Sequence, residues 1–398
     1  MAPPRDEPLL TSRQAAERLG VKLETLYAYV ARGLLRGEPS ARDRAKGPAA
    51  RRYARREIES FLSKRRWSRR VVASAVSSTD GGRLLYRGQD AVVLAGRASF
   101  EQVAALLWTA APGEAAPWPA VPRDAIGEAV RAAKAVPAAG PLVQAQILVA
   151  ALGTRDGTSG DLAAETVTAT GKRLMTRLVA GLAAARGGDV ARASRGPLAA
   201  RVLAALGGQG DDASVHLVDR ALVLSAEHEL NASTFAARVA ASTGADLHAV
   251  VGAGIATLSG PRHGGMTDRV EAAFRACPPV VEEVAMAFGH PLYPSGDPRT
   301  PPLLAAARGR GTGESRRALD AMFALLDARD PRRDPAPTVD VGLAATAMAL
   351  GLAPGLASTL FAIGRTAGWI AHAIEQYGIG ELIRPRARYT GPLPGDDG

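Results

Sequence analysis

The chain has 398 residues, 47% of them apolar and 5% aromatic, and a mean hydropathy of −0.01, so it is long enough for two or three structural units with a sizeable core. Its net charge of +10 lies entirely in residues 1–70, which hold 18 Lys/Arg and 8 Asp/Glu, whereas the remaining residues hold 31 of each. The prevalence of Ala and Leu, with few aromatic residues, argues against sandwiches and barrels and predicts a mainly α fold.

The basic N-terminal region and the single cysteine limit the classes of protein further. A cluster of positive charge is typical of a segment that binds a polyanion, although an arginine-rich solvated surface gives the same count. With Cys277 alone, the chain forms no internal disulfide and no cysteine metal cluster, which favours a reducing cytoplasm. The first residues lack the apolar core of a secretory signal, so we expect a cytoplasmic protein.

The first 66 residues predict a helix-turn-helix unit. Thr11 and Gln14 have the spacing of a capping box for a helix that ends at Leu19. A second helix fits residues 23–31, between two glycines. The apolar positions of both helices are spaced for a shared small core, formed by Ala15, Leu19, Leu26 and Val30.

A basic stretch over residues 36–56 fits a wing, residues 55–64 fit one more helix, and residues 64–70 indicate a basic linker. From residue 10 to residue 63 the chain is similar to the MerR/excisionase class of winged helix-turn-helix domains. The letters that carry this resemblance are TSRQAAERLGVKLETLYAYVARGLL and RRYARREIESFL. The resemblance implies DNA as a possible partner, with the second helix in the major groove. A helical hairpin used for assembly is the alternative.

Beyond residue 70 the sequence predicts a series of helices. Ser99 and Gln102 form another capping box ahead of a helix. Amphipathic segments rich in Ala and Leu follow, around residues 124–135, 143–152, 172–186, 197–206 and 214–226. No alternating apolar and polar run is long enough for a sheet. The uncharged stretch 341–364 is long enough to cross a bilayer, but Gly351 and Pro354 interrupt it, so we expect two buried helices joined by a turn and no membrane partner.

Histidines are the most informative candidates for chemistry, because no P-loop, dinucleotide fingerprint or nucleophile elbow is present. His228, His263 and His290 lie among glycines, prolines or helix-capping residues, which position a side chain through the backbone and favour a chemical role. The other histidines, at positions 216, 248 and 372, fit structural roles. The three candidates are spaced too far apart for a zinc motif, so we expect no metal.

Three arginines and one aspartate complete the candidate site. Arg299, Arg365 and Arg384 lie next to apolar or turn-forming segments, where an arginine needs an anionic partner. Together they suit a small di- or tricarboxylate held by bidentate pairs. The alternative is a set of ordinary salt bridges, to Asp297, Glu375 or Glu381. Asp340 opens an apolar helix, either as an N-cap or as a partly desolvated general base.

These pieces, in this order, resemble the citrate synthase family over residues 71–394. The motifs that carry the resemblance are LLYRGQDAVVLAGRASFEQVAALLW, EHELNASTFAARVAAST, LSGPRHGG, FGHPLYPSGDPR, TVDVGLAA and LIRPRARYTG. Six ordered motifs are far more specific than any one of them. The resemblance implies citrate-synthase-like large and small helical domains behind the winged helix-turn-helix domain. The implied boundaries are 1–66 for the head and linker, 67–261 and 341–398 for the large domain, and 262–340 for the small domain.

The resemblance also implies roles for the candidate residues. His263 polarises the thioester carbonyl of an acyl-CoA, Asp340 removes a proton from its α-carbon, and His290 hydrogen-bonds the carbonyl of oxaloacetate. Four further residues hold the oxaloacetate carboxylates, namely His228, Arg299, Arg365 and Arg384. The last of these comes from the partner subunit of a homodimer. The product is citrate from acetyl-CoA or 2-methylcitrate from propionyl-CoA, with release of CoA and no cofactor beyond the substrates.

Two other functions are compatible with the same sequence. One is a transcriptional regulator in which the citrate-synthase-like body senses an acyl-CoA or a carboxylate while the head binds DNA. The other is an enzyme whose head serves assembly alone. The joint presence of His263 and Asp340 favours an enzyme, because a sensor has no need of both. The segment between His263 and His290 is short for the family, in which this region contributes to the pocket for the CoA adenine.

Overall fold

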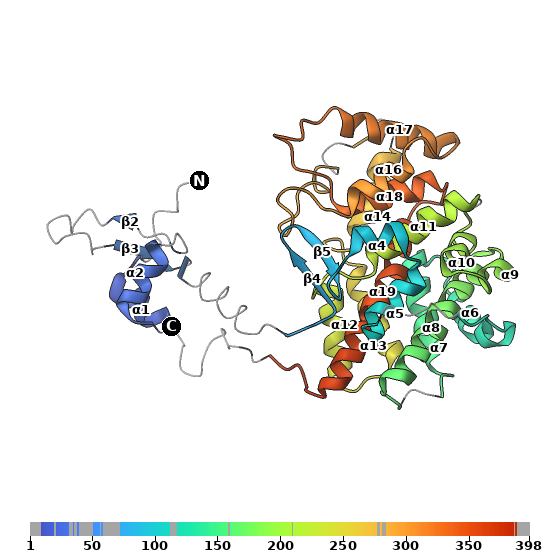
Figure 1. Cartoon of the computed structure of the whole chain (residues 1–398), viewed down its shortest axis with the longest axis horizontal. Helices are drawn as coiled ribbons and strands as arrows, with labels where there is room; N and C mark the ends of the chain where they lie inside the picture. The colour runs from blue at the N-terminus through green and yellow to red at the C-terminus, as the bar shows by residue number, and fades with distance from the viewer. Residues whose placement is uncertain are drawn as a thin grey trace. The chain divides into compact units, whose positions relative to one another are not determined.

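The computed structural model describes residues 9–19, 21–31, 35, 38–39, 51–55, 57–58, 72–111, 118–157, 160–208, 210–276, 279–280, 284–385 and 387. The chain forms two compact units, Met1–Ala73 and Ser74–Gly398 (Figure 1). Both units contain helices and a small antiparallel sheet, and the second unit is mainly helical, as the composition predicts.

The first unit is a helix-turn-helix with a three-stranded sheet. In chain order its elements are β1 (Leu9–Thr11), α1 (Ser12–Leu19), α2 (Leu23–Ala31), β2 (Glu38–Pro39) and β3 (Arg51–Ala54). Strand β3 pairs antiparallel with both other strands, so the sheet order is β1-β3-β2. The capping box is confirmed, because the side chains of Thr11 and Gln14 each accept a hydrogen bond from the other's backbone N–H (3.3 and 3.0 Å).

The core of the first unit confirms most of the predicted apolar positions. Three of the four predicted residues are buried together with Tyr53 of β3, and the fourth, Val30, is partly buried against them. Both helices have the predicted bounds, and β2 and β3 form the antiparallel pair that a wing requires. Most of the helix predicted over residues 55–64, and all of the basic linker 64–70, lie outside the described residues.

The second unit begins with a short sheet and continues as a helical body. The sheet consists of β4 (Ser77–Asp80), β5 (Arg83–Tyr86) and β6 (Gln89–Asp90). The helices that follow are α4 (Ala91–Arg97), α5 (Phe100–Thr109), the 3₁₀ helix η1 (Arg123–Ile126), α6 (Gly127–Lys134), α7 (Pro141–Gly153), α8 (Ala164–Arg186), α9 (Val190–Ala193), α10 (Leu198–Ala205), α11 (Asp212–Ser225), α12 (Ala232–Ser242), α13 (Leu247–Leu258), α14 (Gly265–Arg275), α16 (Thr300–Ala307), α17 (Gly313–Asp327), α18 (Val339–Ala349) and α19 (Ala357–Ile379). Every segment predicted to be an amphipathic helix contains one, although α8 begins at Ala164 rather than near residue 172. The Ser99–Gln102 capping box before α5 is confirmed.

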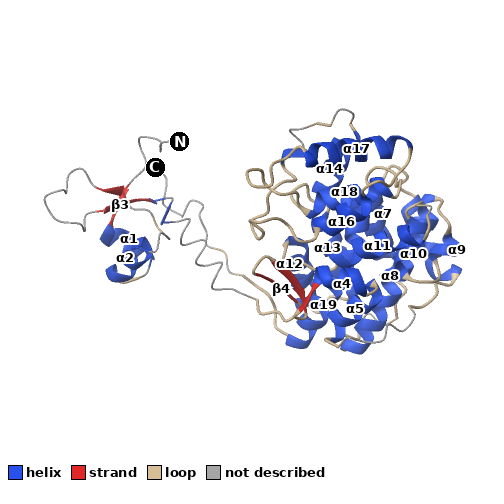
Figure 2. Ribbon diagram, turned by 45° about the horizontal axis from the view of Figure 1, so that its top comes forward, coloured by secondary structure: helices blue, strands red, loops and turns tan. Residues whose placement is uncertain are grey.

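The sheet of β4, β5 and β6 contradicts the expectation that no sheet forms in this part of the chain. Its strands have two to four residues each, too few for a readable alternation of apolar and polar side chains. Gly81 and Gly82 join β4 to β5, and Arg87 and Gly88 join β5 to β6, all with positive φ. Two central residues with positive φ are typical of type I′ hairpin turns, which glycine adopts at little cost. Figure 2 shows the sheet at the edge of the helical body.

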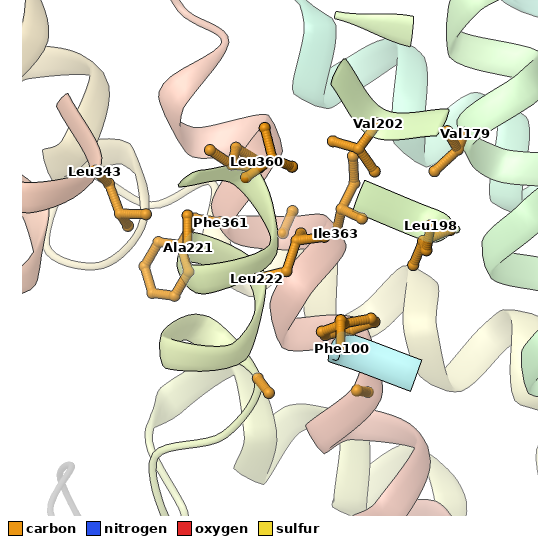
Figure 3. Packing of buried hydrophobic residues seen from close by; sticks show 14 of the residues in the cluster. Phe100, Val179, Leu198, Val202, Ala221, Leu222, Leu343, Leu360, Phe361 and Ile363 are labelled. Atoms are coloured by element: carbon orange, nitrogen blue, oxygen red, sulfur yellow. The ribbon is translucent and has the colours of Figure 1, made fainter. Parts of the chain in front are cut away.

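Helix α19 runs through the interior of the helical body (Figure 1). It packs against α8, α11, α12 and α13, and nearly every residue from Ala357 to Ala373 is buried. Figure 3 shows Phe361 and Ile363 of α19 beside Ala221 and Leu222 of α11. A helix that is enclosed on all sides holds the polar side chains that it carries in fixed positions.

The uncharged stretch forms the predicted pair of buried helices, α18 and α19. The turn between them contains Gly351 and Gly355, both with positive φ. Within the described residues, none of the helices is both long enough and apolar enough to cross a membrane. Because α18 begins at Val339, its first turn carries Asp340, while the buried part of α19 carries Arg365.

Candidate active site

His228 lies between α11 and α12, in a turn with backbone strain. Glu229, the next residue, has a φ of +51°, in the left-handed region that costs about 1–2 kcal/mol for a residue with a side chain. The neighbouring sheet holds this turn. The Ser77 hydroxyl accepts a hydrogen bond from the Glu229 N–H (3.0 Å), and the Tyr86 hydroxyl donates to the Glu227 carbonyl (3.1 Å). The sheet therefore fixes the backbone on both sides of His228.

Tyr293 packs against both His228 and His290, with ring centroids 5.5 and 5.1 Å apart. Its hydroxyl oxygen is 2.9 Å from Nε2 of His228, and the ring centroids of the two histidines are 5.5 Å apart. Nδ1 of His290 accepts a hydrogen bond from the Leu292 N–H (3.2 Å), so the neutral ring carries its proton on Nε2. On the edge of the His290 ring opposite this contact, the Nε2–H is therefore held as a hydrogen-bond donor.

His263 lies in the turn before α14 and is supported by Ser233 of α12. Its Nε2 is 2.7 Å from the Ser233 hydroxyl oxygen. The same hydroxyl accepts a hydrogen bond from Nε1 of Trp369 in α19 (3.3 Å) and donates to Oδ1 of Asn231 (2.8 Å). Nδ1 of His263 has no hydrogen-bond partner among the described residues. One ring nitrogen is therefore fixed by the protein, and the other is available to a substrate.

Asp340 is the second residue of α18, whose N-cap is Thr338, so the N-cap alternative is wrong. Its carboxylate accepts hydrogen bonds from the hydroxyls of Thr267 (2.6 Å) and Thr338 (3.0 Å). Burial raises the pKa of Asp340 above its ordinary value, although the two hydroxyls act in the opposite direction. A carboxylate oriented by two donors and made more basic by burial has the properties of a general base.

Arg299, which is 2% exposed, forms a buried ion pair with Asp297. The contacts are Nε to Oδ1 at 2.9 Å and Nη2 to Oδ2 at 2.6 Å. Burial alone would raise the pKa of Asp297, but the guanidinium holds it below its ordinary value. The salt-bridge alternative is therefore confirmed for this arginine. Its Nη1 has no hydrogen-bond partner among the described residues and remains available to a second anion.

Arg365 is a buried cation without an ion pair among the described residues. It is 1% exposed, its Nε donates to the Ser225 carbonyl (2.7 Å), and the guanidinium carbon lies 4.9 Å from the centroid of the Phe361 ring. Burial lowers the pKa of Arg365 to about 10, while Glu227 acts in the opposite direction. Neither Nη atom has a hydrogen-bond partner in the described part of the chain. Because an unpaired buried guanidinium is costly, this arrangement is typical of an anion site.

The salt-bridge alternative is wrong for Arg365, which forms no ion pair with Glu375 or Glu381 among the described residues; Glu375 pairs with Arg238 instead. Arg384 is exposed in the extended segment after α19, and it has no ion pair or hydrogen bond among the described residues. Within one chain it is therefore not part of the cluster that the other candidate residues form.

The remaining six candidate residues influence one another electrostatically. Burial, Arg299 and Arg365 hold the pKa of His228 well below its ordinary value, and burial with Arg365 lowers the pKa of His263 to about 4. The pKa of His290 is also lowered, mainly by burial, with Asp340 acting in the opposite direction. All three imidazoles are therefore neutral near pH 7. The cluster combines neutral donors, one carboxylate and two cations, which suits proton abstraction next to a carbonyl in the presence of an anion.

Gly368 of α19 faces Glu227, the residue before His228. A matched pair of glycine substitutions in α19 tests how tightly the helix packs against Glu227. A Cβ on Gly368 would overlap the Glu227 carboxylate, which also contacts Nε2 of His372 (3.2 Å), whereas a Cβ on Gly378 of the same helix would meet open space. Gly368→Ala is expected to lower the melting temperature and to weaken dicarboxylate binding. Gly378→Ala is expected to stabilise the protein by up to ~1 kcal/mol. Thermal unfolding of both variants measures this, and equal melting temperatures would contradict it.

Sequence reasoning did not single out Tyr293, Ser233 or the threonines that hold Asp340. The first two lie within FGHPLYPSGDPR and EHELNASTFAARVAAST, so the polar residues beside the histidines in those motifs were the available signal. Ser77, by contrast, is separated by 150 residues in sequence from Glu227, to which its hydroxyl donates. No local pattern reveals a contact of that kind.

Comparisons with known proteins place the chain in a family. Residues 67–386 match the family model described as the C-terminal domain of citrate synthase, and residues 9–66 match a helix-turn-helix domain model. The citrate synthase of Haloferax volcanii is 34% identical over 81% of this chain and 93% of its own length. A putative citrate synthase 2 of Mycobacterium tuberculosis is 40% identical over 49% of this chain, and the chain spans about half the length (56%) of that relative.

Solved structures of citrate synthases have the same fold. The enzyme from Pyrobaculum aerophilum superposes with a TM-score of 0.66 at 25% identity, covering 81% of this chain and 91% of the other. The ternary complex of carboxymethyl coenzyme A and oxaloacetate with the Thermoplasma acidophilum enzyme gives 0.64 at 22% identity, covering 81% and 94%. The family model covers most of the chain and the Haloferax relative aligns over nearly its whole length, so this chain belongs to the citrate synthase family and carries a helix-turn-helix domain ahead of its citrate synthase domain.

Proposed function

We propose that this protein condenses an acyl-CoA with oxaloacetate and then hydrolyses the thioester to release CoA. The observation that carries the proposal is the grouping of a partly buried carboxylate, Asp340, with neutral histidines and with the unpaired cation Arg365. Acetyl-CoA would give citrate, and propionyl-CoA would give 2-methylcitrate, as the names of relatives suggest. The reaction needs no metal or cofactor beyond the two substrates, and the single cysteine in the sequence suits the reducing cytoplasm.

The first step is removal of a proton from the acyl α-carbon by Asp340. The electrons move onto the thioester oxygen, which needs a hydrogen-bond donor because a carboxylate alone is too weak a base for this C–H bond. His263 supplies the donor. Ser233 has one hydroxyl proton, which it donates to Oδ1 of Asn231 in the structure; when this proton rotates to Nε2 of His263, the ring proton lies on Nδ1, which has no hydrogen-bond partner among the described residues.

In the second step the enol carbon attacks the ketone carbon of oxaloacetate and forms a C–C bond. The ketone oxygen takes up a proton, which His290 supplies from Nε2, the nitrogen left protonated by the contact of Nδ1 with Leu292. His228, Arg299 and Arg365 hold the two carboxylates, with the free Nη atoms of the arginines as donors. Water then cleaves the thioester and gives a carboxylate, one of its protons returns to His290, and the proton held by Asp340 leaves with the CoA thiol.

The pH profile of this reaction depends on Asp340, which must be ionised to act. Because burial raises its pKa while Thr267 lowers it, Thr267→Val is expected to move the acidic limb of kcat/KM to higher pH. The activity is lost as the pH falls through that limb, and the histidines do not titrate near neutrality because their pKa values are lowered. Thr346→Val is the matched control, since its hydroxyl bonds only the Gly342 carbonyl in α18. Superimposable profiles would contradict the assignment of the limb to Asp340.

We further propose that residues 67–261 and 341–398 form a large domain and residues 262–340 a small domain. Helices α14, α16 and α17 of the proposed small domain each pack against α18, whose first turn carries Asp340. The candidate residues thus come from both proposed domains. Movement of one domain against the other would expel water from the substrates, as enzymes that stabilise enolates require.

A homodimer would explain Arg384, which is exposed and outside the cluster of its own chain. We propose that it binds oxaloacetate in the site of the partner subunit. Co-expression of Asp340→Asn and Arg384→Met chains tests this arrangement, because each mixed dimer then contains one site with both native residues. Recovery of activity above that of either variant alone supports the proposal. Activity no higher than the sum of the two variants would contradict it.

Release of the CoA thiol tests the proposed reaction directly. The protein is mixed with oxaloacetate and acetyl-CoA, or with propionyl-CoA, and the thiol is followed with a chromogenic disulfide. Release that requires oxaloacetate is expected, and the better acyl donor identifies the substrate. Omission of oxaloacetate is the control for simple thioester hydrolysis. No release from a folded dimer would contradict the proposal and favour the sensor function.

A second candidate function is DNA binding by the head, which is supported by the helix-turn-helix match and the charge of residues 1–70. Lys22 at the start of α2, together with Arg51 and Arg55 near the wing, is exposed. Fluorescence anisotropy with duplex DNA should show an affinity that falls steeply between 50 and 200 mM salt, roughly tenfold or more when a few phosphates are contacted. No binding at low salt would leave assembly as the role of the head.

A further inference from the structure

The turn that carries His228 has a carboxylate on each side of the histidine, one buried and one partly buried. Glu227 is fully buried, His228 is 7% exposed, and Glu229 has the left-handed backbone described above. A strained turn of this kind persists only when surrounding contacts determine it. Such contacts can fix the orientation of the histidine or stabilise the fold as a whole.

Strand β4 supplies most of these contacts. The Ser77 hydroxyl accepts from the Glu229 N–H (3.0 Å) and donates to Oε1 of Glu227 (3.3 Å). The backbone N–H and the hydroxyl of Thr79 both donate to Oε1 of Glu229. Ser77 and Thr79, the two partly buried side chains on one face of the strand, thus bind the residues before and after His228.

The geometry of the histidine depends on this support. Strand β4 lies at the edge of its three-stranded sheet, and its other side is paired with β5, whose Tyr86 also bonds the backbone of Glu227. The His228 ring is held at its far end by the Tyr293 hydroxyl. If the β4 contacts were lost, Glu229 would relax toward negative φ. The peptide plane after His228 would then turn and the ring would lose its alignment with Tyr293.

We propose that β4 belongs to the oxaloacetate site and that Ser77 and Thr79 are positioning residues. They hold the turn of residues 227–229 and thereby keep His228 in the orientation that binds the substrate. This inference rests on the proposed condensation reaction. It assigns to the site a strand that contributes no group to the chemistry and that lies about 150 residues away in sequence.

Substitutions at Glu229 and Ser77 separate positioning from general stability. Glu229→Ala removes the acceptor for both Thr79 donors, whereas Glu229→Gln keeps a neutral oxygen acceptor at the same place. Glu229→Ala and Ser77→Ala are expected to raise the dissociation constant and the KM of oxaloacetate about tenfold, a loss typical of one charge-assisted hydrogen bond. Glu229→Gln is expected to recover most of the affinity. The KM of the acyl-CoA and the kcat at saturating oxaloacetate should change less than twofold.

Thr166→Val is the matched control, because its hydroxyl also donates to a carboxylate, that of Asp161 next to α8. Binding is measured by calorimetry on the full-length protein with oxaloacetate alone, and turnover by thiol release. Unchanged oxaloacetate affinity in Glu229→Ala and Ser77→Ala would overturn the inference. An equal loss in both substrates, without rescue by Glu229→Gln, would show a merely structural role and overturn it too. If the wild type binds no oxaloacetate, the proposed function itself fails, and the inference with it.

Discussion

Asp340→Asn is expected to lower kcat by about a thousandfold, within the range of 10²–10⁴ that general bases contribute. The amide has the shape of the carboxylate and can still accept a hydrogen bond from the Thr267 hydroxyl, but it cannot take up the α-proton. Oxaloacetate affinity should change little, because the cations and His228 that we propose to hold this substrate are untouched. Steady-state thiol release and calorimetric titration of oxaloacetate together measure the two effects.

Asp219→Asn is the control for this substitution. Asp219 is also a partly buried carboxylate, its pKa raised to about 6 mainly by burial, but it accepts its hydrogen bond from the Phe100 N–H at the start of α5. This variant should lose some stability and keep its kcat. A loss of turnover in both variants, or in neither, would remove Asp340 from the role of base.

Arg365→Met is expected to raise the dissociation constant of oxaloacetate about a hundredfold, because hydrogen bonds to charged groups contribute roughly 1.5–3 kcal/mol each. The same change should not lower the melting temperature. Arg365 has only one hydrogen bond within the described residues, to the Ser225 carbonyl, so its removal relieves more desolvation than it breaks in contacts. Calorimetry of Arg365→Met should therefore show weaker binding of oxaloacetate, while thermal unfolding of the same variant shows no loss of stability.

Arg201→Met provides the contrast. Arg201 is also 2% exposed, but its three guanidinium nitrogens donate to the carbonyls of Gly196, Pro119 and Trp118. Its loss leaves three acceptors unpaired and should destabilise the protein by several times ~1 kcal/mol without an effect on oxaloacetate. If the two arginine variants behaved alike, the free donors of Arg365 would not indicate an anion site.

Much of the fold was accessible from sequence because its signals are local. The bounds of α1 and α2 follow from a capping box and from glycines, and the two helices around residue 351 follow from breakers in an uncharged run. The sheet of β4 to β6 was missed because strands of two to four residues carry no readable period. The adjacent glycines Gly81 and Gly82, a pair typical of a two-residue hairpin turn, were the available evidence for it.

The candidate site was predicted as a set of residues but not as a geometry. Sequence identified His228 and Arg365 by their surroundings, yet the same reasoning left salt bridges open for every arginine. Coordinates separate the cases, since Arg299 has a bidentate partner and Arg365 has none among the described residues. The supporting residue Thr267 gave no sequence signal of its own, because a single hydroxyl in a helix is common and its partner Asp340 lies 73 residues along the chain.

The position of β4 directly after the junction of the two units has a practical consequence for protein engineering. The Ala75 N–H donates to Oε1 of Glu375 in α19 (2.7 Å), so the backbone is already bound to the helical body two residues before the strand begins. A headless version must therefore start at or before Ser74, since a start at Asp80 would delete Ser77 and Thr79 while leaving every catalytic candidate in place. Any module fused at this end is followed within a few residues by the strand whose Ser77 and Thr79 bind the turn that carries His228.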